Sequence, residues 1–215
     1  MNERKICFIM CVNSVEYESE QMKYLQSLHI PAGYEMEVLS IWDAISMTAG
    51  YNEAMSASDA KYKIYLHQDV FIIERDFIEK ILKIFKTKEI GLIGMVGSVC
   101  FPENAIMWYG GRVGNLYGNM RYKTQKSKLR TVQGEYCAVE AVDGLLMATQ
   151  YDLPWREDLF DGWDFYDVSQ SREFIRAGYQ VVVPRQEKPW CLHDDGFLNL
   201  KNYYRYREKF LKEYC

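Results

Sequence analysis

Long apolar runs and segments with helical spacing take turns along the first half of the chain. Lys5–Val12 is almost continuously apolar, as expected for a strand that is covered on both faces. Glu16–Leu28 then spaces its apolar residues along one face of a helix, and Asn13-Ser14 can cap that helix. Tyr34–Trp42 is a second strand pattern, and Ser46 begins a helix of small residues.

A third strand pattern, Lys61–Ile73 (KYKIYLHQDVFII), completes the order strand, helix, strand, helix, strand. This order predicts an α/β fold with a Rossmann-like, mostly parallel central sheet and helices on both faces. An amphipathic helix over Arg75–Phe85 and a buried strand over Ile90–Val96 continue the pattern.

Beyond residue 96, glycines mix with aromatic residues and with a basic run at Arg121, Lys123, Lys126, Lys128 and Arg130. We expect a strand over Ile106–Val113 and a mobile excursion over Gly114–Gly134, which could contain a hairpin. Glu135–Thr149 is expected to return to the core as an apolar segment, and Asp161–Ala177 to begin as a loop and become a helix that ends before Gly178. Tyr179–Val183 should form a short strand and Phe197–Tyr214 a C-terminal helix.

The composition is that of one globular domain of 215 residues, with 48% hydrophobic and 26% charged residues. We expect a nucleotide-binding half over about residues 1–96 and an acceptor and catalytic half over about 97–195, followed by the C-terminal helix 197–214. The net charge of -4 argues against a nucleic-acid partner.

Other features of the sequence bear on where in the cell the protein is found. No apolar run approaches the length of a membrane span, and Met1–Lys5 leads into a strand pattern rather than a signal peptide. The six cysteines form no CxxC pair, so we expect a reduced, cytoplasmic protein. The basic run is typical of a solvated loop, and contact with an anionic acceptor or the inner membrane surface is the alternative.

Three polar residues, His67-Gln68-Asp69, interrupt the apolar run Lys61–Ile73. Polar side chains between apolar runs are costly to bury unless they are paired or bind a ligand. The imidazole and the carboxylate lie two residues apart, on one face of a strand, where they could hold a divalent cation. We therefore expect the centre of an active site here.

The order and spacing of several motifs between Ile6 and His193 resemble a GT-A glycosyltransferase of the family 2-like group. The motifs are Cys11-Val12-Asn13, Asp43, Ala49–Ala54, His67-Gln68-Asp69, Asp143-Gly144, Gly162–Asp167 and His193. The resemblance implies the GT-A fold, a Mn²⁺ or Mg²⁺ ion, a nucleoside-diphosphate sugar donor, and transfer to a hydroxyl acceptor. We expect a UDP-sugar donor; the acceptor could be a glycan, a lipid-linked molecule or a protein.

The resemblance also implies roles for individual residues. Asp69 resembles the last Asp of the DxD metal motif, and His193 resembles the late His that completes metal coordination. Asp167 aligns with the catalytic base. The donor-binding positions it implies are Cys11, Asn13, Asp43, Asn52, His67, Gln68, Asp143 and Gly144. Trp108 and Trp163 are candidates for stacking on a sugar.

Two positions depart from the family pattern. His67 stands at the first DxD position, where it could bind the metal, contact ribose or do neither. Tyr166 stands where Glu is usual, which leaves Asp167 as the aligned carboxylate and makes Asp164 and Asp161 rival bases.

In the expected chemistry a cation neutralises the departing diphosphate, and a carboxylate takes the proton of the acceptor hydroxyl. The dipole of the following helix should keep Asp167 ionised. A single clear catalytic carboxylate favours single displacement with inversion. A non-catalytic nucleotide-sugar or glycan-binding module is the alternative; a nucleotidyltransferase is disfavoured because residues 11–19 contain no Gly, Lys or Arg.

Each role competes with a structural explanation. Asp69 and Asp167 could be strand-end or helix-cap residues, and Asp43 a turn residue. Asn52 could be an ordinary polar helix position, and His193 could pair with a neighbouring acid on the surface. Asp143 lies in an apolar run, where an unpaired carboxylate is costly.

Overall fold

A seven-stranded sheet forms the centre of the protein in a computed structural model that describes residues 1–120, 123–194 and 199–215. The strand order is β10 (Tyr136–Ala138), β13 (Gln180–Pro184), β5 (Ile90–Gly94), β12 (Leu146–Thr149), β3 (Ala60–Leu66), β1 (Asn2–Val12) and β2 (Glu35–Trp42). β1 runs parallel to β2 and β3, and β5 runs parallel to β13. β12 is antiparallel to both β3 and β5, so those two share a direction, and only β10 and β12 run against the rest. The predicted mostly parallel α/β sheet is confirmed.

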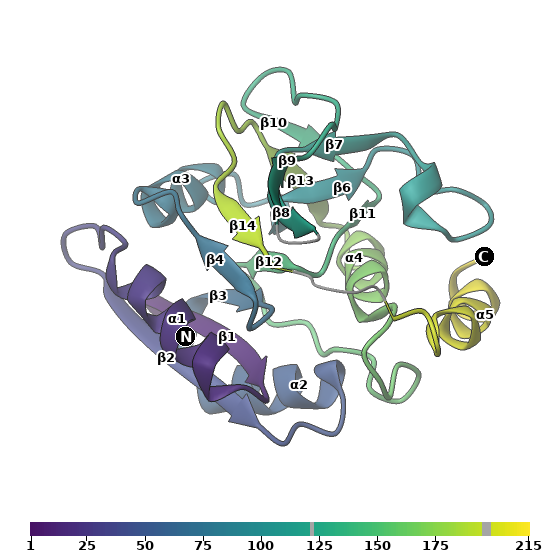
Figure 1. Ribbon diagram of the computed structural model, residues 1–215, viewed down its shortest axis with the longest axis horizontal. Helices are drawn as coiled ribbons and strands as arrows, with labels where there is room; N and C mark the ends of the chain where they lie inside the picture. The colour runs from purple at the N-terminus through teal and green to yellow at the C-terminus, as the bar shows by residue number, and fades with distance from the viewer. Residues whose placement is uncertain (121–122, 195–198) are drawn as a thin grey trace.

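Strand β1 shows why helices cover both faces of this sheet. Its even-numbered residues Ile6, Phe8 and Met10 pack in one core cluster with α1 (Val15–Gln26) and α3 (Phe77–Ile84). Its odd-numbered residues Cys7, Ile9 and Cys11 pack in a second cluster with α2 (Met47–Ala57) and α4 (Tyr166–Arg176). Successive side chains of a strand point to opposite faces, so a continuously apolar strand requires cover on both (Figure 1).

Two small sheets lie beside the central one. One has the order β11 (Ala141–Val142), β6 (Val96–Ser98), β7 (Arg112–Gly114). The other has the order β4 (Val70–Ile72), β14 (Cys191–His193), β8 (Tyr117–Met120), β9 (Lys123–Lys126). In it β14 pairs antiparallel with β4, which places His193 opposite Val70. The end of β14 therefore lies next to Asp69, far away in the sequence.

Several predicted elements need correction. Lys61–Ile73 is two strands, β3 and β4, which separate at His67-Gln68-Asp69. The strand expected over Ile106–Val113 is wrong in its first part, because Met107–Tyr109 forms a 3₁₀ turn and only β7 is extended. The hairpin considered within the following excursion is confirmed by the antiparallel pairing of β8 with β9.

The C-terminal helix α5 spans Tyr203–Tyr214 and begins later than expected. Residues 197 and 198 of the expected helix lie outside the described residues, and Lys201-Asn202 form a turn. Tyr206 and Phe210 bury α5 against Phe160 and Phe165. No helix within the described ranges is long and apolar enough to cross a membrane.

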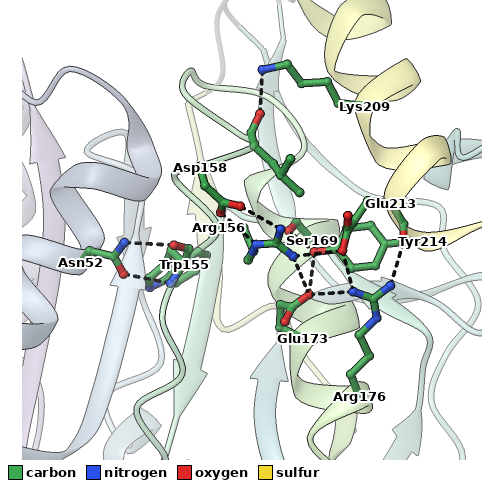
Figure 2. A network of polar contacts seen from close by, with 11 residues as sticks. Asn52, Trp155, Arg156, Asp158, Ser169, Glu173, Arg176, Lys209, Glu213 and Tyr214 are labelled. Atoms are coloured by element: carbon green, nitrogen blue, oxygen red, sulfur yellow. Dashed lines mark hydrogen bonds and ion pairs between the residues drawn. The ribbon is translucent and has the colours of Figure 1, made fainter.

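Ion pairs hold α5 to the loop before α4 and to the end of α4. Arg156 Nη1 lies 3.1 Å from Glu213 Oε1, and Arg176 Nη1 lies 2.9 Å from the same oxygen (Figure 2). Glu173 adds contacts to both guanidinium groups. The loop that precedes α4 is thereby anchored to the C-terminal helix α5.

Lys63 is fully buried within β3 and pairs with the carboxylate of Asp152. Its Nζ lies 2.9 Å from each oxygen of Asp152 and 2.8 Å from the Ala60 carbonyl. Replacing Asp152 with alanine would leave a buried charge without its partner, so Asp152→Ala should lower the free energy of unfolding by about 3–5 kcal/mol. Chemical denaturation measures this.

A matched control removes an exposed ion pair instead. Lys23 Nζ lies 3.2 Å from Glu20 Oε2 on the surface of α1, and Glu20→Ala should cost less than about 1 kcal/mol. An equal loss of stability in the two variants would contradict the role given to Asp152.

Candidate functional site

A cleft of about 450 Å³ opens where β3 ends and α4 begins. In sheets of this kind, ligands bind outside the carboxyl ends of the parallel strands. The predicted residues that line the cleft are His67, Asp69, Trp108, Asp143, Trp163, Asp164, Asp167 and His193. The structure thus brings together residues from five separate segments of the chain.

A larger cavity of about 670 Å³ lies between α3 and residues 184–190. It contains none of the predicted site residues, and two of its lysines form ion pairs: Lys80 Nζ lies 2.5 Å from Glu74 Oε2, and Lys83 Nζ lies 2.7 Å from Glu135 Oε1. The smaller cleft, which gathers four carboxylates and two histidines, is therefore the candidate site.

His67, Asp69 and His193 form the part of the cleft that could hold a metal ion. One ligand atom from each lies within 4.8 Å of the others. Asp69 Oδ1 lies 3.5 Å from His193 Nε2 and 3.9 Å from His67 Nδ1. Two imidazole nitrogens and one carboxylate oxygen suit Mn²⁺, whose ligand preference lies between those of Mg²⁺ and the softer metals.

The triad keeps its carboxylate ionised. Burial by itself raises the pKa of the Asp69 carboxyl, but contact with His193 and the charge of His67 outweigh it, and the net shift is downward. Burial, followed by the charge of His193, lowers the pKa of the His67 imidazole. Ionised carboxylate and neutral imidazole are the forms that bind metals.

The other nitrogen of His67 is in contact with Tyr166. His67 Nε2 hydrogen-bonds to the Tyr166 hydroxyl, and burial raises the pKa of that phenol, which keeps it neutral. Tyr166 opens α4 directly after Phe165, whose left-handed φ of 65° turns the chain into the helix. The sequence marked both His67 and Tyr166 as departures from the family pattern, and the structure joins them.

Asp167 lies one residue further along α4, and its carboxylate faces the loop after β11. Its Oδ2 accepts a hydrogen bond of 2.9 Å from the Gly144 N–H. A Cβ on Gly144 would overlap the Tyr166 hydroxyl, so only glycine fits between these two side chains. Gly144 therefore borders the site through its backbone.

Burial, and then the neighbouring Asp143, raises the pKa of Asp167 to about 7. The expectation that the helix dipole keeps this group ionised is wrong in its net direction, because desolvation outweighs the favourable backbone contacts. The helix-cap explanation does not hold either, since Phe165 occupies the N-cap position. A carboxyl that titrates near neutrality is suited to general base catalysis.

The two rival bases are placed differently. Asp164 lines the cleft, and burial raises its pKa. Asp161 is absent from the cleft lining and is exposed beside α5, where the Lys209 ammonium, 2.8 Å away, is the main cause that lowers its pKa to about 2. Asp164 remains a candidate by position, and Asp161 does not.

Several expected donor-binding residues are absent from the cleft lining. Gln68 Oε1 accepts a 2.9 Å hydrogen bond from the Asn13 N–H, and Gln68 Nε2 donates to Asn13 Oδ1 at 2.7 Å. Cys11 is buried in the core against α2. Asp43 is exposed in a turn with a left-handed φ of 56°.

Asn52 is bound to another part of the protein. Its side chain accepts from the Trp155 N–H at 2.8 Å and donates to the Trp155 carbonyl at 3.0 Å, which ties α2 to the loop before α4 (Figure 2). Glu157 accepts a further bond. These contacts use both N–H groups of the amide and one lone pair of its oxygen, and they agree with a structural role for Asn52.

The cleft lining contains both expected and unexpected residues. Trp108 and Trp163 line it with 39% and 51% of their surfaces exposed, as expected for stacking candidates. The residues that sequence reasoning missed are Arg112 and Tyr203, which line the cleft although no motif marks either position.

The basic run does not take part in ion pairs with described residues. Its members Lys123, Lys126, Lys128 and Arg130 are exposed, and Arg121 lies outside the described residues.

Comparison with solved structures shows the fold. A mannosyltransferase, PcManGT from Pyrobaculum calidifontis, in complex with GDP-Man and Mn²⁺, matches 97% of this chain with a TM-score of 0.58 and 10% identity. GalNAc-T7 with UDP, GalNAc and Mn²⁺ matches 96% with a TM-score of 0.63 and 10% identity. The S. aureus TarS fragment 1–349 with UDP matches 94% with a TM-score of 0.56 and 9% identity. The chain spans 61%, 48% and 63% of these three structures, less than two thirds of each.

No curated protein sequence matches the chain. The family model described as "Glycosyltransferase like family" matches residues 7–214. This match, together with the GT-A fold of the structural neighbours, confirms the expected resemblance. The chain belongs to the glycosyltransferase-like family.

Proposed function

We propose that the protein transfers a sugar from a nucleoside-diphosphate sugar to a hydroxyl acceptor with the help of a divalent cation. The observation that supports this most is the presence, in one cleft, of the triad His67, Asp69 and His193 and the near-neutral carboxyl of Asp167. The family match supports the reaction class. A UDP-sugar is the donor we propose, with Mn²⁺ favoured over Mg²⁺ by the nitrogen ligands.

In this proposal Asp69 and His193 hold the cation, which when bound neutralises the charge that develops on the departing diphosphate. Asp167 accepts the proton of the attacking acceptor hydroxyl at a carboxylate oxygen. Burial, and then repulsion by Asp143, raise the pKa of that carboxyl and so keep it basic. Because the proposal gives this work to one carboxylate and assigns no nucleophile of the protein, it is a single displacement with inversion.

The remaining residues would shape the two substrate sites. Trp108 and Trp163 offer exposed ring faces in the cleft for stacking against a sugar. The region of Cys11, Asn13, Asp43 and Gln68 is the proposed nucleotide side. The acceptor and a cytoplasmic location stay predictions from the sequence.

A thermal-shift panel tests the donor. UDP or a UDP-sugar at about 100 times its Kd should stabilise the protein by about 2.7 kcal/mol when Mn²⁺ is present, which raises the Tm by roughly 5–10 °C for a chain of this size. The nucleotide alone or Mn²⁺ alone should give a much smaller shift. A larger shift with GDP-sugars would move the donor to that class, and no shift with any nucleotide sugar would contradict the proposed function.

A further inference from the structure

The contact between Tyr166 and His67 determines which nitrogen of the imidazole can bind a metal. A neutral imidazole carries its proton on one nitrogen and has a lone pair on the other. Nε2 of His67 meets the Tyr166 hydroxyl, whereas Nδ1 lies 3.9 Å from Asp69 Oδ1. Only Nδ1 therefore faces the position where a cation would contact Asp69 and His193.

Tyr166 has little freedom to move away from this contact. The side chain is only 4% exposed. Its ring lies 6.0 Å from the ring of Tyr51 and 6.1 Å from that of Trp155, and its hydroxyl fills the space beside Gly144. The phenolic oxygen is consequently a fixed partner for His67, on the side away from Asp69.

We propose that Tyr166 is a positioning residue: its oxygen accepts the Nε2–H of His67, and Nδ1 is thereby the third protein ligand of the cation, with Asp69 Oδ1 and His193 Nε2. This inference rests on the metal dependence of the proposed function and extends it. The opposite tautomer would place the proton on Nδ1, where no lone pair remains for a metal. Groups that orient a metal-binding histidine through its second nitrogen commonly change metal affinity 10–100-fold when they are removed.

The arrangement has a consequence for metal choice. Two nitrogens and one oxygen from the protein favour Mn²⁺, Co²⁺ or Zn²⁺ over Mg²⁺, which prefers oxygen ligands. If His67 did not bind, a single nitrogen and a single oxygen would remain, and the preference for Mn²⁺ would be weaker.

Calorimetry of Mn²⁺ binding to the full chain tests the inference without an activity assay. Tyr166→Phe keeps the ring and removes the hydroxyl, and we expect its Mn²⁺ affinity to fall 10–100-fold. The matched control is Tyr51→Phe, in the same aromatic cluster: the Tyr51 hydroxyl contacts the Leu66 carbonyl, and its loss should leave the affinity within about twofold.

A double-mutant cycle shows whether Tyr166 acts through His67. His67→Leu should weaken Mn²⁺ binding at least as much as Tyr166→Phe does. Adding Tyr166→Phe to His67→Leu should then cause no further loss, because the residue that Tyr166 positions is gone. An equal additional loss in that background would overturn the inference.

Pulsed EPR of Mn²⁺ bound to the wild-type protein needs no variant. Coupling to two imidazole nitrogens is expected, and coupling to one nitrogen would overturn the inference. Wild-type affinity in Tyr166→Phe would also overturn it while leaving the proposed function intact. A wild-type protein that binds no Mn²⁺, with or without UDP, would defeat both.

Discussion

Replacing Asp167 with asparagine should lower the rate of sugar transfer by about 10³-fold, within the range of general base catalysis, and spare the binding of UDP and Mn²⁺. Asparagine has nearly the same shape and can still accept the hydrogen bond from the Gly144 N–H. It cannot take a proton from an acceptor hydroxyl. Steady-state kinetics and a thermal shift with UDP and Mn²⁺ measure the two properties separately.

Asp164→Asn is the matched comparison, since Asp164 lines the same cleft and its pKa is also raised by burial. We expect this variant to retain transfer within about tenfold, a loss that corresponds to roughly 1.4 kcal/mol. Full turnover by Asp167→Asn, together with loss of turnover by Asp164→Asn, would assign the base to Asp164.

The pH dependence of the reaction follows from the same carboxyl. The pKa of Asp167 is raised to about 7, so its base form is lost as the pH falls below that value. We expect kcat/KM to rise with pH through about 7 and then level off. A profile that is flat between pH 5 and pH 8 would contradict the assignment.

The stability of the fold should change with pH in the opposite direction to activity, because of the same Asp167 carboxyl. A carboxyl whose pKa is higher in the folded than in the unfolded state stabilises the fold below the unfolded value, and this contribution is lost as the pH rises through the folded value. Asp167→Asn should therefore raise the Tm relative to wild type at pH 8 and not at pH 4.

Replacing Asp69 with asparagine should have the second large effect, on the metal. Asp69 supplies the only carboxylate of the triad. The attraction between this negative charge and a divalent cation contributes most to the binding of the metal. We expect the Mn²⁺ affinity of Asp69→Asn to fall by more than about 100-fold, a larger loss than follows from removing a group that only orients a metal ligand. The stabilisation by UDP with Mn²⁺ should disappear.

The control for Asp69→Asn is Asp194→Asn. Asp194 follows His193 directly, but its carboxylate accepts a hydrogen bond of 3.1 Å from the Tyr17 hydroxyl and does not belong to the triad. This variant should bind Mn²⁺ about as the wild type does. If both variants bound Mn²⁺ normally, the cation would be held elsewhere.

The sequence predicted the sheet and its covering helices because their signals are local. The apolar run of β1 and the helix spacing of α3 depend only on neighbouring residues, and each was confirmed. The strand β14 was missed, since Cys191–His193 is too short to have a period of its own and is extended only by pairing with β4. His193 was expected from the family pattern, yet its distance from Asp69 depends on that pairing.

The same distinction holds within the site. Asp69 and Asp167 could be found because each lies at a strand end or helix start in a recognisable motif. Tyr166 could be marked only as a departure, since its contact with His67 joins residues that are distant in the sequence. The upward shift in the pKa of Asp167 depends on burial and on Asp143, and neither can be inferred from the position of Asp167 at the start of a helix.

The most direct test of the account is the release of nucleoside diphosphate from a nucleotide sugar by the wild-type protein. With UDP-sugars and Mn²⁺ we predict steady release of UDP. A chelator should stop this release, and excess Mn²⁺ should restore it. The Asp69→Asn variant should release no UDP. Release that continues unchanged in the chelator, or in Asp69→Asn, would contradict a metal-dependent glycosyltransferase centred on Asp69.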